Sequence, residues 1–167
     1  MQMVGLRALE EIAASYPLRG IDLEGKTVID VGCDWGNSPL YWRMRGASKV
    51  VGFEADRKRI AWMKALRSEP WFDFRGPWRG ETPPGDVFKI DCEGCETNLD
   101  IEALRQYSLW FVAIHPSSVT AKLGLPETVG LAPRLEAIGG EKVYAVPGET
   151  MYRGGDLARS LPPHRAR

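Results

Sequence analysis

Residues 26–54 read KTVIDVGCDWGNSPLYWRMRGASKVVGFE, and this stretch decides the fold. An apolar run at 27–31 leads into a turn with two glycines, and a second apolar run at 49–53 ends at Glu54. Short apolar runs with β-branched residues are typical of buried parallel strands. Glycine lets the chain turn tightly and lets the backbone approach a ligand. The stretch therefore predicts a strand, a glycine turn, a helix and a second strand.

The same alternation continues along the rest of the chain. Further strands are predicted at 71–74, 86–91, 109–114, 142–146 and 150–153, and helices at 3–15, 37–46, 56–67, 100–107 and 127–138. Alternating strands and helices predict a three-layer α/β/α, Rossmann-like fold with a mostly parallel sheet and an antiparallel C-terminal hairpin. We expect one domain over 1–154, with an N-terminal helix within 1–20, and a flexible tail over 155–167.

The composition narrows the possible functions. The 167 residues include 22 basic and 22 acidic side chains, so net charge does not draw the whole molecule toward polyanions. No run approaches the roughly 20 apolar residues of a membrane span, and the N-terminus does not read as a signal peptide. Three cysteines argue against a disulfide framework. We expect a cytoplasmic protein, and the sequence does not indicate its oligomeric state.

The carboxyl ends of the strands are where open α/β sheets bind ligands. The turn at Gly32 and Gly36 is not a phosphate-binding loop, because no Gly-Lys-Ser/Thr follows it. It is not a GxGxxG dinucleotide loop either, because Asp34 and Asn37 stand where glycines are needed. Glu54 follows Gly32 by about 20 residues, the spacing at which a carboxylate holds a ribose. The turn and Glu54 predict a nucleoside-binding site; the alternative is an ordinary turn and a surface acid.

The segment after the fourth predicted strand gathers acidic residues. Residues 89–96 read KIDCEGCE. Acids so close raise one another's pKa unless a positive or hydrogen-bonding group lies among them. A cofactor, an acceptor amine or hydroxyl, or a metal would supply that group, and the alternative is a solvated loop.

KIDCEGCE resembles the K-I-D-x-E-G-x-E signature of the FkbM family of class I methyltransferases. The Asp-Val-Gly at 30–32 with Gly36 resembles that family's D-V-G-A-N-x-G turn, and Phe53-Glu54 resembles the end of its second strand. The resemblance covers residues 26–115. It implies a Rossmann-like methyltransferase fold, S-adenosyl-L-methionine as cofactor, and methyl transfer to a hydroxyl of a sugar, lipid or other small molecule.

The resemblance also implies roles for single residues. Methyl transfer starts from an activated sulfonium, so positioning the acceptor is most of the catalytic task. We expect Asp91 and Glu93 to orient the acceptor or the cofactor, and His115, after the fifth strand, to accept the hydroxyl proton. The expected cofactor-binding residues are Asp30, Gly32, Cys33, Asp34, Gly36, Glu54, Asp73, Phe74 and Asp91. Asp34 stands where the family often has Asn, and an acid expected before His115 is replaced by Ala113.

Three other interpretations stay open. Basic residues interleaved with tryptophans over 57–79 suit a surface for single-stranded RNA, with RNA as substrate or partner. The chain could be a metal or redox protein, because Cys92 and Cys95 form a CxxC, and Cys33 and His115 lie at other strand ends. These four side chains could converge on zinc, although we assign none of them as a metal ligand. The chain could also keep the fold without catalysing transfer. The sequence does not identify the methyl acceptor.

Overall fold

The sheet has the predicted mostly parallel arrangement. The computed structural model describes residues 6–18, 20–63, 66–116, 130–146 and 149–159. Within these ranges seven strands form one sheet in the order β3-β2-β1-β4-β5-β7-β6. The strands are β1 (Thr27–Val31), β2 (Lys49–Phe53), β3 (Phe72–Phe74), β4 (Val87–Ile90), β5 (Leu109–Ile114), β6 (Glu141–Val146) and β7 (Glu149–Gly154). Strands β1 to β5 pair in parallel, and β7 runs antiparallel to both β5 and β6.

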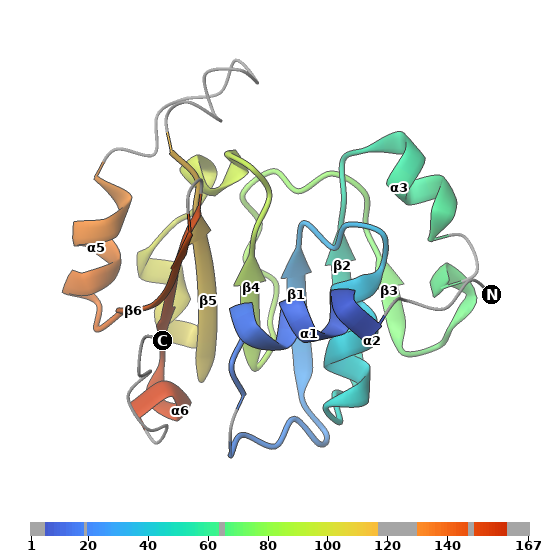
Figure 1. Cartoon of the computed structure of the whole chain (residues 1–167), viewed down its shortest axis with the longest axis horizontal. Coiled ribbons are helices and arrows are strands. Elements are labelled where there is room, and N and C mark those ends of the chain that lie inside the picture. The colour runs from blue at the N-terminus through green and yellow to red at the C-terminus, as the bar shows by residue number, and fades with distance from the viewer. Residues whose placement is uncertain (1–5, 19, 64–65, 117–129, 147–148, 160–167) are drawn as a thin grey trace.

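Helices cover both faces of the sheet. They are α1 (Leu6–Ser15), α2 (Asn37–Met44), α3 (Arg57–Trp62), α5 (Leu131–Ala137) and α6 (Asp156–Arg159), with short 3-10 helices η1 (Leu66–Ser68), η2 (Cys95–Asn98) and η3 (Glu102–Gln106). Helices α1 and α2 lie in front of the central strands in Figure 1. Successive side chains of a strand point to opposite faces of the sheet, so each face has its own hydrophobic core. Val28 belongs to the core on one face together with Trp42 of α2, and Ile29 belongs to the core on the other face together with Leu135 of α5. Three layers result, as predicted.

The structure corrects the predicted helix at 100–107. Residues 102–106 form a 3-10 helix instead. Ile101, Leu104 and Tyr107 are buried. The Leu104 N–H donates to the Ile101 carbonyl, and the Tyr107 N–H donates to the Leu104 carbonyl, each three residues back. In a 3-10 helix, residues three apart lie on the same side, so this apolar spacing of three buries all of them against the sheet.

The C-terminal part of the chain also differs from expectation. The expected tail begins with α6, whose Leu157 N–H donates to the carbonyl of Ser108. Residues 160–167 of the expected tail lie outside the described ranges. Of the helix predicted at 127–138, residues 127–129 also lie outside them, and the described part contains α5. Among the described residues no helix is long and apolar enough to cross a membrane.

The strand register brings several chain segments to one edge of the sheet. Val31 pairs with both Phe53 and Ile90, so β1, β2 and β4 end side by side. Strand β5 ends at the same edge, and because β7 is antiparallel to it, β7 begins there: Ile114 pairs with Thr150. Residues just after β1, β2, β4 and β5, and just at the start of β7, can therefore form one site.

Candidate functional site

A cavity of about 550 Å³ opens at this edge of the sheet. Its walls come from the ends of β1, β2 and β4, from α1, and from the start of β7. The lining residues are Glu11, Ile12, Ser15, Tyr16, Val31, Gly32, Asp34, Asn37, Ser38, Phe53, Glu54, Ala55, Asp56, Arg59, Trp78, Lys89, Asp91, Cys92, Glu93, Cys95 and Glu149. Both polar groups and aromatic rings face the space, which suits a nucleoside with a charged tail.

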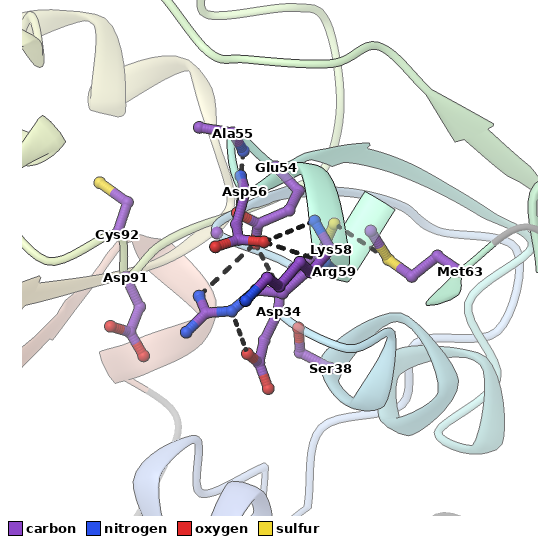
Figure 2. A network of polar contacts seen from close by, with 12 residues as sticks. Asp34, Ser38, Glu54, Ala55, Asp56, Lys58, Arg59, Met63, Asp91 and Cys92 are labelled. Atoms are coloured by element: carbon purple, nitrogen blue, oxygen red, sulfur yellow. Dashed lines mark hydrogen bonds and ion pairs between the residues drawn. The ribbon is translucent and has the colours of Figure 1, made fainter. Parts of the chain in front are cut away.

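Glu54 is fixed in the cavity wall by the backbone around it. Its Oε1 accepts hydrogen bonds from the N–H groups of Ala55 and Asp56, and its Oε2 accepts one from Asp34 at 2.9 Å. Figure 2 shows this network with Arg59, whose guanidinium lies 3.1 Å from Asp34 Oδ1 and 3.9 Å from Glu54 Oε2. A carboxylate oxygen can accept two hydrogen bonds, so Oε2 keeps capacity for a ligand hydroxyl.

The glycine turn touches the segment after β4. Gly32 has φ +76, and a Cβ added to it would lie 1.8 Å from the carbonyl oxygen of Asp91. Asp34 and Glu93 are the described non-glycine residues with positive φ, at 51° and 57°. Both line the cavity. Such conformations cost energy, and they occur most often at binding and catalytic sites.

Asp30 and Lys89 form a buried ion pair beneath the turn. Their side chains are 0% and 2% exposed, and Lys89 Nζ lies 3.0 Å from Asp30 Oδ1. Nζ also donates to the carbonyl of Gly32 at 2.6 Å, while Asp30 Oδ2 accepts from Ser38 Oγ and Trp42 Nε1. Burial lowers the pKa of Lys89, but the charges of Asp30 and Asp91 and the hydrogen bond to Asp30 together outweigh it, so the pKa is raised. Asp30 therefore supports the site from below without lining it.

His115 is held by a buried carboxylate. The Oε1 of Glu96 accepts from the His115 backbone N–H at 3.1 Å and lies 3.0 Å from His115 Nδ1, and Oε2 accepts from Gly94 N–H. His115 Nε2 lies 3.5 Å from Asp91 Oδ1, and Asp91 Oδ2 accepts from Tyr16 Oη at 2.7 Å. Burial lowers the pKa of His115, but the hydrogen bond and charge of Glu96 together with the charges of Asp91 and Glu149 outweigh it, so the pKa is raised.

The structure does not join the four soft ligands into a zinc site. Cys92 and Cys95 form a disulfide, which removes the thiolates that zinc needs. Cys33 is a free, buried cysteine whose Sγ lies 3.8 Å from Met63 Sδ. Three cysteines argued against a disulfide framework, and the structure has this one disulfide, within the CxxC at 92–95.

The predicted site residues divide into two groups. Those lining the cavity are Gly32, Asp34, Glu54, Asp91 and Glu93. Those that do not line it are Asp30, Cys33, Gly36, Asp73, Phe74 and His115. Gly36 packs against Met63, and Asp73 pairs with Lys49 and Arg75 on the outer strand β3. His115 is 6% exposed and lies behind Asp91.

Several lining residues were not predicted, and four of them are Tyr16, Trp78, Lys89 and Glu149. Lys89 opens the KIDCEGCE segment, so its position next to Asp91 in the sequence was an available signal. The other three reach the cavity from segments distant in the sequence, and no local pattern marks them.

Sequence comparison finds relatives of limited coverage. No protein-family profile matches the chain. An uncharacterized protein of Sulfolobus islandicus filamentous virus is 41% identical over 99 residues, which cover 57% of this chain and 63% of that protein. An uncharacterized protein of Sulfolobus islandicus rod-shaped virus 1 is 36% identical over 101 residues, covering 57% and 64%. The chain thus spans less than two thirds of the length of these relatives.

Structure comparison finds methyltransferases. A dimethyladenosine transferase from Plasmodium falciparum superposes with a TM-score of 0.63 at 15% identity, over 89% of this chain and 60% of that one. Aeropyrum pernix fibrillarin, crystallized with S-adenosyl-L-methionine, gives 0.58 at 16% identity, over 87% and 75%. Magnesium protoporphyrin IX methyltransferase from Synechocystis, crystallized with SAH, gives 0.58 at 13% identity, over 88% and 81%. The chain has the Rossmann-like fold of class I S-adenosylmethionine-dependent methyltransferases.

Proposed function

We propose that the chain binds S-adenosyl-L-methionine and transfers its methyl group to a hydroxyl of a small molecule. The observation that carries the proposal is the meeting of Gly32 and Glu54 in one cavity, at the ends of adjacent parallel strands. Two structural neighbours were crystallized with S-adenosyl-L-methionine or SAH in the same fold. The specific likeness to the FkbM family stays part of this proposal.

The cofactor half of the site would hold the nucleoside. Glu54 Oε2 accepts a ribose hydroxyl, because its other bonds already fix the carboxylate in place. Trp78 offers an apolar wall for the adenine, and its Nε1 is satisfied by the carbonyl of Glu81. Gly32 lines the cavity where the methionine end would lie, and its missing side chain lets the turn contact the segment after β4. The bound cofactor supplies an activated methyl group.

The acceptor half of the site would position the hydroxyl. Asp91 and Glu93 line the cavity and can accept hydrogen bonds from the acceptor. His115 lies next to Asp91, so the proton leaving the hydroxyl is expected to move toward this pair. Buried Lys89 holds the carbonyl of Gly32 close to Asp91 and so keeps the two halves together.

Calorimetry with S-adenosylhomocysteine tests the proposal. Glu54→Gln keeps the shape but loses the charge, and a hydrogen bond to a charged group contributes about 1.5–3 kcal/mol, so we expect an affinity about 10-fold to 100-fold weaker. Asp73→Asn is the matched control, because Asp73 was expected near the adenine but lies outside the cavity; its affinity should stay within about twofold. Equal affinities for Glu54→Gln and the unaltered protein would remove Glu54 from the site.

A pair of exposed tryptophans favours RNA as a second candidate acceptor. Trp35 and Trp62 are exposed, at 43% and 56%, and their rings meet edge to face with centroids 6.0 Å apart. Exposed Arg57 and Lys58 lie on the same helix as Trp62. Exposed aromatic rings beside basic residues can stack and hold single-stranded RNA.

Filter binding of a short single-stranded RNA tests this candidate. Retention that falls steeply with salt, and falls further in Trp62→Ala, would support an RNA acceptor. Lack of retention at low salt would exclude it and leave the small-molecule hydroxyl.

A further inference from the structure

Three side chains able to bind a metal ion meet at the acceptor end of the cavity. Asp91 follows β4, His115 follows β5, and Glu149 opens β7, so the sheet register brings all three to one place. One ligand atom from each lies within 4.8 Å of those from the other two. Metal ligands around one ion lie about 3 Å apart, so small side-chain rotations would close the set.

Two of the three ligand groups are already oriented by neighbours. Glu96 lies 3.0 Å from His115 Nδ1, and Nε2 faces Asp91 Oδ1 at 3.5 Å. Tyr16 donates to the other oxygen of Asp91. A carboxylate behind the second ring nitrogen is the arrangement that orients metal-ligating histidines in proteins.

The charges around the cluster favour a cation. Asp91, Glu96 and Glu149 bring three carboxylates to one small region, and Glu96 is fully buried. Lys89, whose charge reaches Asp91, is itself paired with Asp30 at 3.0 Å. Carboxylates held this close together, one of them fully buried and two partly exposed, are costly unless a positive group joins them.

We infer that Asp91, His115 and Glu149 bind one divalent cation, Zn²⁺ or Mn²⁺. One imidazole nitrogen and two carboxylate oxygens suit these ions, and three protein ligands leave a coordination position for a further oxygen. Asp91 and Glu149 line the cavity, so that position faces the space for the acceptor.

The role of the cation, though not its binding, rests on the proposed function. A bound divalent ion lowers the pKa of a coordinated hydroxyl, which would let the acceptor lose its proton at neutral pH. His115 then acts as a ligand, and the cation replaces it in promoting the loss of the proton. The acceptor would be a molecule whose hydroxyl oxygen can coordinate the ion.

Titration of the chelator-treated protein with Mn²⁺ alone tests the site, with free Mn²⁺ followed by electron paramagnetic resonance. We expect one saturable site that Zn²⁺ displaces. Glu149→Gln and His115→Gln should each weaken binding about tenfold or more. Glu149 is the safer variant, because it lies at the cavity rim on the hairpin. Glu102→Gln is the control: Glu102 is exposed and pairs with Arg105, so its affinity should be unchanged.

Two results would overturn the inference. One is the absence of saturable Mn²⁺ or Zn²⁺ binding. The other is equal Mn²⁺ affinity of the Glu149→Gln and Glu102→Gln variants, provided that both have the same free energy of unfolding as the original protein. Calorimetry with S-adenosylhomocysteine separates this inference from the proposed function. Metal binding without S-adenosylhomocysteine binding would support the cation site and contradict the methyltransferase proposal. The reverse would overturn the cation site alone.

Discussion

The two halves of the cavity are built in different ways. In the cofactor half, Glu54 is held by Ala55 and Asp56, which follow it directly, and by Asp34, 20 residues away. In the acceptor half, Tyr16 reaches Asp91 across 75 residues of sequence. Glu54 of the cofactor half is therefore positioned by one β-α-β segment, whereas the acceptor half forms only when the whole sheet is assembled. Variants that affect one half and spare the other should separate them.

The largest effect is expected where the two halves are joined, at the buried pair of β1 and β4. Asp30→Asn leaves the charge of Lys89 buried without its partner, and breaking a buried ion pair costs about 3–5 kcal/mol. Chemical denaturation followed by tryptophan fluorescence should show the free energy of unfolding lowered by this amount.

Two comparisons test whether that loss comes from the unpaired charge. Asp73→Asn breaks an exposed pair and should cost less than about 1 kcal/mol. Adding Lys89→Met to Asp30→Asn should recover much of the lost stability, because it removes the stranded charge. If the double variant is no more stable than Asp30→Asn, the charge of Lys89 is not the cause.

The next effect concerns the contact between the glycine turn and Asp91. Gly32→Ala introduces a Cβ that would lie 1.8 Å from a backbone carbonyl, at φ +76. Gly25 has a similar φ of +74 but no atom within 4 Å of the added Cβ. Both substitutions suffer the cost of a left-handed alanine, about 1–2 kcal/mol, and Gly32→Ala should lose about 1–3 kcal/mol more from overpacking.

Binding measurements extend this test to the ligand. Gly32→Ala should weaken S-adenosylhomocysteine binding, because the turn and Asp91 must move apart, whereas Gly25→Ala should leave the affinity unchanged. Similar stabilities for the two variants would mean that the turn and the segment after β4 can separate at little cost.

The sequence located the strand ends that carry the cofactor half, but five of the residues it assigned to the cofactor do not line the cavity. The bounds of β1, β2 and β5 agree with the apolar runs, and Gly32 and Glu54 line the cavity because they follow directly after strands. Asp30 does not line the cavity because, one residue before the strand end, its side chain points to the face packed by Trp42. Cys33 does not line it either, and its Sγ contacts Met63 Sδ.

The acceptor half could not be predicted from local patterns. Glu149 reaches the cavity only because β7 pairs antiparallel with β5, and the expected hairpin gave no register. Tyr16 reaches it because α1 packs across the sheet edge, a contact that apolar spacing does not specify. Asp91 and His115 were predicted as site residues. Glu96, which contacts His115, was predicted only to belong to a segment rich in acidic residues.

The smallest effect is expected from one hydroxyl that connects α1 to the acceptor half. Tyr16→Phe removes the hydrogen bond to Asp91 Oδ2, which should lower the free energy of unfolding by about 1 kcal/mol. Tyr41→Phe is the matched control, because its buried hydroxyl donates to the Tyr16 backbone carbonyl and leaves the Tyr16 hydroxyl free to donate to Asp91. Both variants should lose similar stability, and both should keep their affinity for S-adenosylhomocysteine, since Glu54 is held by its own segment.

Mn²⁺ binding should weaken only in Tyr16→Phe, because only there does Asp91 lose the hydrogen bond that orients it. Equal Mn²⁺ affinities in the two variants would show that Asp91 is oriented without α1, and the acceptor half would then be as locally built as the cofactor half.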